Sequence, residues 1–335
     1  MKINFNNIFK LFLIILLLPT LSLSYKVHRS YVLQATLLQE LNSNTYTENT
    51  LNRLINTDID FPNLSVTALP MNGILARYLY AFDKNSEAID LLNEVPPYKD
   101  YLYFNENIKA IIYNNLGLKD SSLYYSKMAF QNLPGNANHY EQYVKNLVQL
   151  NDSITLIKSF SNTAYEYDYQ FSKIFLAAAL NLKLKSSSVM EITNEIKSLY
   201  PLDSELMLMT DYVLYGADNV NTSIDLTKIA EGEFEDGHYK RALELFMEAN
   251  KLNPSSYTNY ENIGLTYYRL NMYEKAIPYL TLVIKDFKPK DGKAEYILGM
   301  CYKDLGNSKK ACDYFLKSYK LNFKAAFSEY SLICK

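Results

Sequence analysis

Tryptophan is absent from this 335-residue chain, and glycine and proline are scarce, at ten residues each. Folds made of many short strands need a turn every few residues, and those turns depend on Gly and Pro. This scarcity therefore argues against an all-β fold. The aromatic residues that are present, 31 Tyr and 16 Phe, suit packing between helices.

The chain also lacks an excess of charge of either sign, since its formal net charge at pH 7 is −2. Proteins that bind nucleic acid electrostatically carry a basic patch or stripe. The one local basic stretch, residues 285–293, has Asp286 and Asp291 interleaved, which is typical of a solvated loop. The sequence therefore predicts no nucleic-acid partner.

Groups that could do chemistry are few. The three histidines, His28, His139 and His238, stand alone, and we expect His28 and His238 to lie on the surface. The sequence contains no Gly-rich phosphate loop, no Cys–His pairing and no HExxH helix. The acidic stretch 231–236 spreads over several faces of a helix, which is typical of a solvated surface. We expect no enzymatic activity, no cofactor and no metal site.

One pattern recurs along residues 223–325. In each copy two apolar-periodic segments of about a dozen residues flank a short turn, which predicts a helical hairpin. The second segment of each copy carries an alanine, and the three alanines are spaced 34 and 35 residues apart: Ala242, Ala276 and Ala311. A large apolar residue follows each alanine one helical turn later: Phe246, Leu280 and Phe315.

Small residues mark the places where the two helices of a hairpin meet. Gly264 and Gly299 lie on first helices, where a side chain would hold the second helix away. In the first copy Ala249 and Pro254 complete the pattern. Because one hairpin cannot bury both of its faces, such copies must stack.

This pattern resembles the tetratricopeptide repeat. The resemblance implies an all-α fold, a right-handed superhelical solenoid of stacked helical hairpins, and a role in binding proteins rather than in chemistry. Residues 69–102 and 103–136 fit as degenerate copies, whereas the Asn-, Thr- and Asp-rich residues 42–66 are typical of a loop. The predicted parts are a signal peptide or membrane anchor at 1–24, an N-terminal helix and flexible lead-in at 25–66, divergent hairpins at 67–222, three clear repeats at 223–325 and a capping helix at 326–335.

The N-terminus carries an apolar run, Leu11–Leu18, after two lysines. Pro19 ends this run, and Ser22 and Ser24 place small residues at positions −3 and −1 of a cleavage site before Tyr25. The layout is typical of a secretory signal peptide, and the run is too short to span a bilayer comfortably. An uncleaved anchor and a buried soluble helix remain as alternatives. With a signal or an anchor, the protein would be exported, periplasmic or envelope-associated.

The three cysteines, Cys301, Cys312 and Cys334, all lie in the last repeat and its tail. This ending resembles the last repeat of secreted repeat proteins of the Bacteroidetes type, in which two cysteines staple a final helix. The resemblance implies a Cys312–Cys334 disulfide that holds a cap over the last hairpin, with Cys301 as a buried thiol. The alternative is three unrelated buried thiols.

In the family that the repeats resemble, first helices line a concave partner-binding face. By that register the face carries Glu231, Phe234, Glu261, Asn262, Leu265, Tyr268, Arg269, Lys293, Tyr296 and Met300, with Thr227, Glu235, Lys303 and Asp304 beside them. Members that bind chaperones grip a C-terminal carboxylate there. Of the residues that form that grip, only Asn262 and Lys293 match in this chain, and Glu231 would repel a carboxylate. The mixed aromatic and charged lining suits instead a peptide or helix laid in a groove.

The sequence therefore predicts a non-enzymatic scaffold or adaptor of the bacterial cell envelope that binds a protein partner. The second hypothesis is an accessory subunit of a surface-polysaccharide or secretion enzyme system. It depends on residues 124–143, which resemble the repeat region attached to some bacterial surface-polysaccharide ligases.

Overall fold

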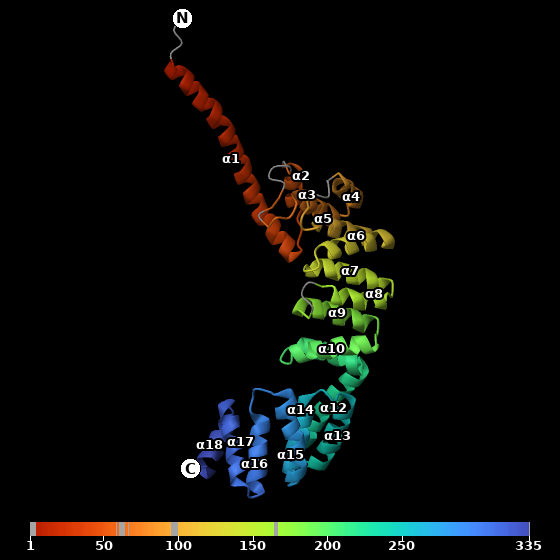
Figure 1. Ribbon diagram of the computed structural model, residues 1–335, viewed down its shortest axis with the longest axis vertical. Helices are drawn as coiled ribbons and strands as arrows, with labels where there is room; N and C mark the ends of the chain where they lie inside the picture. The colour runs from red at the N-terminus through yellow and green to blue at the C-terminus, as the bar shows by residue number, and fades with distance from the viewer. Residues whose placement is uncertain are drawn as a thin grey trace. The chain divides into compact units, whose positions relative to one another are not determined.

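The computed structural model describes residues 5–57, 59, 64–65, 67–94, 100–163 and 167–334, with side chains from residue 12 onward (Figure 1). Within these ranges every named element is a helix, which confirms the all-α prediction of a solenoid of helical hairpins. The chain divides into two compact units, Met1–Ala178 and Ala179–Lys335. Each unit is described by itself.

The first unit begins with one long helix, α1 (Phe5–Ser43). Pro19 does not end it, although proline supplies no backbone N–H. The hydroxyl of the adjacent Thr20 donates to the Leu17 carbonyl at 2.9 Å within the same helix. Residues 12–29 are exposed, whereas Leu33 and Leu37 are buried in the core of the unit. By length and composition the segment Phe12–Ser43 could cross a membrane, and a signal sequence meets the same criterion.

Eight further helices follow α1 in chain order, the last of which continues into the second unit. They are α2 (Glu48–Ile55), α3 (Met71–Ala81), α4 (Asn85–Asn93), α5 (Phe104–Asn115), α6 (Lys119–Asn132), α7 (Ala137–Gln149), α8 (Ser153–Ser161) and α9 (Tyr169–Asn181). Fully buried alanines lie where the helices of a hairpin touch, as Ala76 and Ala88 do in α3 and α4. Aromatic rings fill the wider gaps, and the ring centroids of Phe160 and Phe175 are 4.7 Å apart.

The prediction of a loop over residues 42–66 is wrong for α2. Thr47 caps this short helix by accepting a hydrogen bond from the backbone N–H of Thr50, and Leu51 and Leu54 are buried in the core. Two leucines three residues apart are enough to bury one face of a two-turn helix, even among polar neighbours. Residues 58, 60–63 and 66 of the predicted loop, and residues 1–4 of the predicted signal, lie outside the described residues.

The second unit continues the hairpins. Its helices are α10 (Ser187–Leu199), α11 (Ser204–Tyr215), α12 (Ala217–Glu235), α13 (Tyr239–Leu252), α14 (Tyr257–Arg269), α15 (Tyr273–Leu282) with the π-helical turn η2 (Val283–Phe287), α16 (Lys293–Asp304), α17 (Ser308–Lys320) and α18 (Lys324–Ile333). The glycines lie at close contacts, because a Cβ on Gly264 would meet Leu280 Cγ at 2.6 Å and one on Gly299 would meet Phe315 Cε1 at 2.5 Å.

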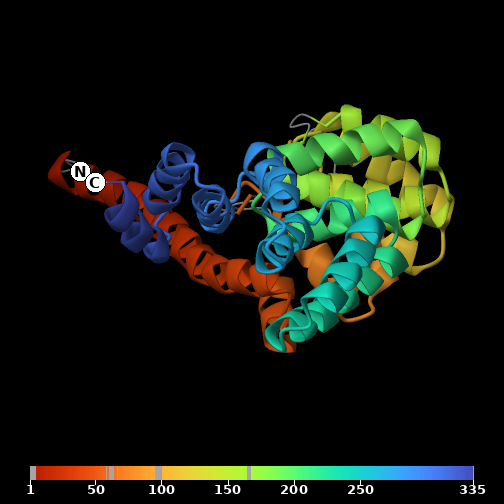
Figure 2. The same ribbon diagram turned by 90° about the horizontal axis from the view of Figure 1, so that it is seen from below.

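The last helix, α18, lies beside α17 in both views (Figures 1 and 2). A disulfide joins Cys312 on α17 to Cys334 directly after α18, with the two Cα atoms 5.6 Å apart. Cys301 is a free and buried thiol. This is the arrangement that the resemblance to secreted repeat proteins implied. The remaining domain boundaries proposed from the sequence stay predictions.

Candidate partner-binding groove

The ten residues predicted to line the groove lie on three helices of the second unit. Glu231 and Phe234 are on α12, five residues from Glu261 to Arg269 are on α14, and Lys293, Tyr296 and Met300 are on α16. A hydrogen bond joins α12 to α14 beside these residues: the Thr227 hydroxyl donates to Asn259 Oδ1 at 2.7 Å. Asn259 is 1% exposed and was not singled out from the sequence.

Four of the ten residues gather around one hollow that is lined by α12, α13 and α14. We call it the acidic hollow; its volume is about 210 Å³ and it is lined by Glu231, Phe234, Glu235, Phe246, Asn262 and Leu265. Asn262 is buried, and its Nδ2 donates to Glu231 Oε1 at 3.3 Å. The apolar side chains supply the walls, and one of them, Phe246, belongs to the repeat pattern but not to the ten predicted groove residues.

The charge of the acidic hollow is uniformly negative. Its only ionisable lining residues are Glu231 and Glu235, which are exposed and lie one helical turn apart on α12. Among the described residues, neither carboxylate forms an ion pair. Like charges at this spacing repel each other, so a cation placed between them is favoured.

A second pair of predicted residues is already engaged within the protein. Lys293 Nζ lies 2.5 Å from Glu261 Oε2, and the Glu261 side chain is 4% exposed. Burial raises the pKa of Glu261, and the hydrogen bond from Lys293 opposes this rise. The pair thus joins α14 to α16 within the protein.

Glu295 is a buried carboxylate that the sequence analysis missed. It is 6% exposed, and burial raises its pKa, with Asp291 and Glu261 adding to the effect. It stands 34 residues after Glu261, so the repeat register could have identified it as the equivalent position.

The third copy places its predicted groove residues against the cap. The Tyr296 ring packs on Phe323 with centroids 5.1 Å apart, and Lys303 Nζ lies 2.7 Å from Glu329 Oε2 on α18. The hydrogen bond that Lys303 donates to Glu329 raises the pKa of Lys303. Arg269 is exposed and Met300 is half-buried. Predicted residues of α12 and α14 therefore line one hollow, whereas Lys293 and Tyr296 of α16 contact other parts of the protein.

In the second copy, Tyr268 lies against an acidic residue of the third copy. Burial raises the pKa of Tyr268, and the nearby charge of Asp304 and a hydrogen bond to it add to the effect. This contact uses two residues of the predicted face within the protein. The assignment of the ten residues to partner binding stays a prediction.

Comparison with known families matches residues 257–285 and 294–324 to the tetratricopeptide repeat. No curated protein matches the sequence. Among solved structures, the tetratricopeptide repeat domain of P58(IPK) is 12% identical over 91% of this chain and 88% of that chain, with a TM-score of 0.41. A tetratricopeptide repeat protein from Parabacteroides merdae is 11% identical over 91% of this chain and 99% of that chain, with a TM-score of 0.28.

The complex of the TPR2AB domain of yeast Sti1 with pHSP90 is 12% identical over 69% of this chain and 96% of that chain, with a TM-score of 0.32. The two matched segments coincide with α14 to η2 and with α16 and α17. Proteins with such repeats generally mediate protein–protein interactions. Residues 257–285 and 294–324 of the second unit therefore match the tetratricopeptide repeat, the family that the spacing of the alanines and glycines predicts.

Proposed function

We propose that this protein is a non-enzymatic scaffold or adaptor that binds a protein partner through the acidic hollow. The observation that supports this most directly is the hollow itself, which combines apolar walls with two exposed carboxylates that form no ion pair among the described residues. A lysine or arginine side chain has the matching form, since its aliphatic stem packs on apolar surface while its charged head stays near solvent.

The size of the acidic hollow agrees with this occupant. At about 210 Å³ it is smaller than the roughly 300–1,000 Å³ typical of sites for drug-sized ligands or cofactors. It accommodates one long side chain, and the rest of the partner would lie along the row of α12 and α14. We further propose that a basic residue of the partner enters the hollow and fixes the register of the bound segment.

We also propose that the protein acts outside the cytoplasm, in the cell envelope. Two features support this location. The first part of α1 exposes apolar residues from Phe12 to Leu23, as a signal or an anchor would. The Cys312–Cys334 bond is of a kind that persists in oxidising compartments.

The test uses the full chain and a matched pair of charge variants. Glu231→Gln together with Glu235→Gln neutralises the acidic hollow, whereas the control Glu233→Gln removes a charge from the same helix outside it, where Glu233 Oε2 lies 2.9 Å from His238 Nδ1. Partners would be captured from solubilised envelope and mapped on peptide arrays that include lysine-to-norleucine and arginine-to-citrulline replacements.

We expect the double variant to lose binding at least tenfold, and wild-type binding to weaken with salt and with replacement of one basic residue of the partner. The control variant should bind as the wild type does. Equal binding by the wild type and the double variant would show that the hollow is not the site.

A further inference from the structure

The first unit contains a pocket of about 420 Å³ that the proposed function does not use. Residues of α3, α5 and α7 line it, together with the end of α1 and the turn that follows α1. We call it the Arg77 pocket, after the arginine in its lining. All of its lining residues belong to the first unit, whereas those of the acidic hollow belong to the second, so the two are separate sites.

The Arg77 pocket carries an excess of positive charge. Its charged lining residues near pH 7 are two cations, Arg77 and Lys145, and one carboxylate, Glu141. Lys145 Nζ lies 2.8 Å from Glu141 Oε1, one turn away on α7, so these two charges offset each other. His139 also lines the pocket, and burial lowers its pKa to about 4, which leaves the ring neutral near pH 7. The guanidinium of Arg77 is therefore the uncompensated charge of the lining.

Neutral groups hold Arg77 in place. Its Nε donates to the Tyr46 hydroxyl at 2.9 Å, and its Nη2 donates to Asn44 Oδ1 at 3.2 Å. The guanidinium also lies over two aromatic rings, with Cζ 5.7 Å from the centroid of Tyr46 and 5.4 Å from that of Tyr80. A guanidinium has five N–H donors, so three of them, two on Nη1, have no acceptor in the part of the chain that the structure describes.

The alternative is a purely structural arginine, since these contacts join α3 to the turn after α1. The second unit shows how structural cations are satisfied in this protein: Lys197 pairs with Asp211, and Lys303 pairs with Glu329. Arg77 is half-buried too, but no carboxylate among the described residues pairs with it. A guanidinium that is positioned but not neutralised can accept a bidentate anion from outside the protein.

The start of α7 adds to the positive potential of the Arg77 pocket. Asn136, the N-cap, and Asn138, in the first turn, both line the pocket, and this turn contains no acidic residue. The N-terminus of a helix carries a partial positive charge that favours an anion nearby. Asn136 Oδ1 already accepts from the backbone N–H groups of Asn138 and His139, so the helix contributes through its dipole rather than through these two donors.

We propose that the Arg77 pocket binds a carboxylate, to which the remaining N–H groups of the guanidinium donate. One positive charge in excess matches the single negative charge of a carboxylate, whereas a phosphate monoester carries about −1.5 to −2 at pH 7. The carbon chain that bears the acid would contact the apolar part of the lining: Leu41, Leu69, Phe104, Ile108 and Ile111. The carboxylate belongs to an acidic side chain or to the end of a chain, and the experiment separates these two sources. This inference does not rest on the proposed function.

The experiment is saturation-transfer difference NMR on the full chain in detergent at pH 7, with small blocked amino acids as probes. N-acetyl-glutamate methylamide carries a side-chain carboxylate, N-acetyl-leucine carries a terminal one, and N-acetyl-glutamine methylamide is the neutral match of the first. At least one acid should receive tenfold more saturation than the glutamine analogue, and that acid identifies the source. Equal transfer to the glutamine analogue would overturn the proposal, and so would tighter binding of N-acetyl-phosphoserine methylamide than of either acid.

Charge variants test whether Arg77 makes the site. Arg77→Gln removes the uncompensated charge and should reduce the transfer to the acid at least tenfold. Arg77→Lys keeps the charge but loses the planar fork, so it should weaken binding at least threefold, and it serves as the measurement if Arg77→Gln does not fold. The control is Lys84→Gln, which removes a surface cation of the same unit, paired with Glu87 at 3.7 Å, and should bind as the wild type does. Unchanged binding by either Arg77 variant would overturn the proposal.

Thermal melts separate a ligand site from a structural role. A ligand that binds the folded state raises the thermal midpoint, so at equal ionic strength the acid should raise the midpoint of the wild type and of Lys84→Gln but not that of Arg77→Gln. A wild-type midpoint that does not respond to the acid, together with a lower midpoint for Arg77→Gln, would show that Arg77 is only structural. The double variant Glu231→Gln, Glu235→Gln should keep its response to the acid, which distinguishes failure of this site from failure of the acidic hollow.

Discussion

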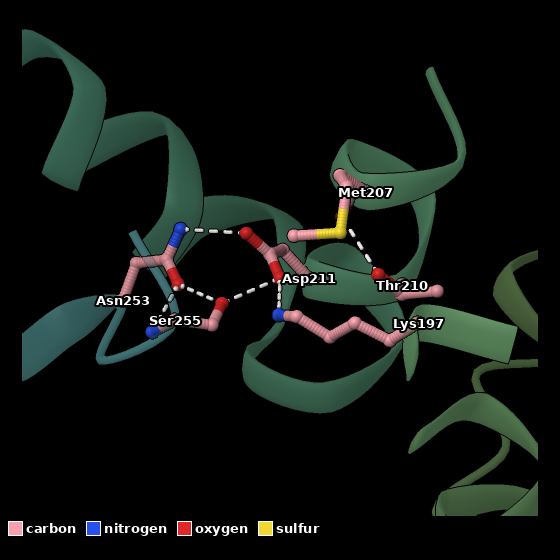
Figure 3. A network of polar contacts seen from close by, with 6 residues as sticks. All are labelled: Lys197, Met207, Thr210, Asp211, Asn253 and Ser255. Carbon is pink, nitrogen blue, oxygen red and sulfur yellow. Dashed lines mark hydrogen bonds and ion pairs between the residues drawn. The ribbon is translucent and has the colours of Figure 1, made fainter. Parts of the chain in front are cut away.

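The carboxylate of Asp211, on α11, accepts a hydrogen bond from Asn253, which ends α13 forty-two residues later in the chain; the Oδ2–Nδ2 distance is 3.0 Å (Figure 3). The Ser255 hydroxyl donates to the same carboxylate, and Lys197 of α10 forms an ion pair with it. One buried carboxylate therefore fastens the divergent hairpin α10–α11 to the clear repeats.

We expect Asp211→Asn to destabilise the second unit by about 3 kcal/mol, because it leaves the largely buried Lys197 ammonium without its counter-charge. The control is Asp225→Asn, which breaks a solvent-exposed pair with Lys228 and should cost about 0–1 kcal/mol. Urea unfolding followed by circular dichroism gives both values. Similar losses for the two variants would mean that the Asp211 contacts do not stabilise the junction.

The contact between α14 and α15 is tested by two Gly→Ala variants. Gly264→Ala places a Cβ 2.6 Å from Leu280 Cγ, and such overpacking costs about 1–3 kcal/mol. Gly232→Ala, on α12, meets nothing within 4 Å and should stabilise by about 0.5–1 kcal/mol because alanine favours the helix. Thermal melts should therefore shift in opposite directions. Shifts of the same sign would contradict the close contact between Gly264 on α14 and Leu280 on α15.

The stability of the first unit should depend on pH through His139. Its folded pKa, about 4, lies below the ordinary value of 6.5, so the unfolded chain binds more protons between these values. The stabilising contribution is thus complete above pH 6.5 and is lost as the pH falls through 4, by about 2–3 kcal/mol between pH 7.5 and 4.5.

His139→Leu should abolish this part of the pH dependence of the free energy of unfolding in urea. The control is His238→Gln, which alters an exposed histidine and should leave the pH dependence of the free energy of unfolding unchanged. Glu106, in the same unit, has a pKa raised by burial and acts in the opposite sense, so the informative quantity is the difference between wild type and variant. A difference that is independent of pH would contradict the burial of a neutral His139.

The repeat contacts could be predicted from the sequence because close approach permits only small residues. Gly264 and Ala276 are fixed by that requirement, and both are buried between helices. Helix α2 could not be predicted, since the burial of Leu51 and Leu54 depends on α1 and α3, which no local pattern reveals.

The candidate site likewise contains residues that the repeat register could predict and contacts that it could not. The register placed Glu231 and Asn262 on the same predicted face, and the structure shows that they are hydrogen-bonded. It could not show that Lys303 is taken by Glu329, because that contact depends on where α18 packs. Nor does a sequence show whether a buried polar atom such as Gln142 Nε2 finds a partner.

The N-terminus is tested by intact mass. If Ser24 precedes a cleavage site, protein exported by a suitable host should begin at Tyr25. Cleavage there removes exposed residues of α1 and leaves Leu33 and Leu37 in the core, so the shortened chain should keep its fold. A mass that includes Met1 in the exported fraction would indicate an anchor instead.

The disulfide is tested by counting thiols in protein purified from the exporting host without reductant. We expect one free thiol, Cys301, and it should react only after unfolding, because burial raises its pKa to about 12 and shields it.

The Cys312–Cys334 bond closes a loop with a sequence separation of 22, for which the chain-entropy estimate is a stabilisation of about 3 kcal/mol. The double variant Cys312→Ser, Cys334→Ser should lose that amount. Cys301→Ala is the control, since it keeps the bond and changes only the core.

Three free thiols would show that the cysteines are unpaired and that the apolar contacts of α18 alone hold the cap. Those contacts are modest: Ala326 is the only residue of α18 that is fully buried, and Phe327 is 53% exposed although its ring packs on Tyr319 with centroids 5.2 Å apart. A helix with so little buried surface is stable chiefly through its tether. Reduction should therefore increase amide exchange in α18 first, before that of α14 and α16, and uniform exchange across the unit would contradict this account.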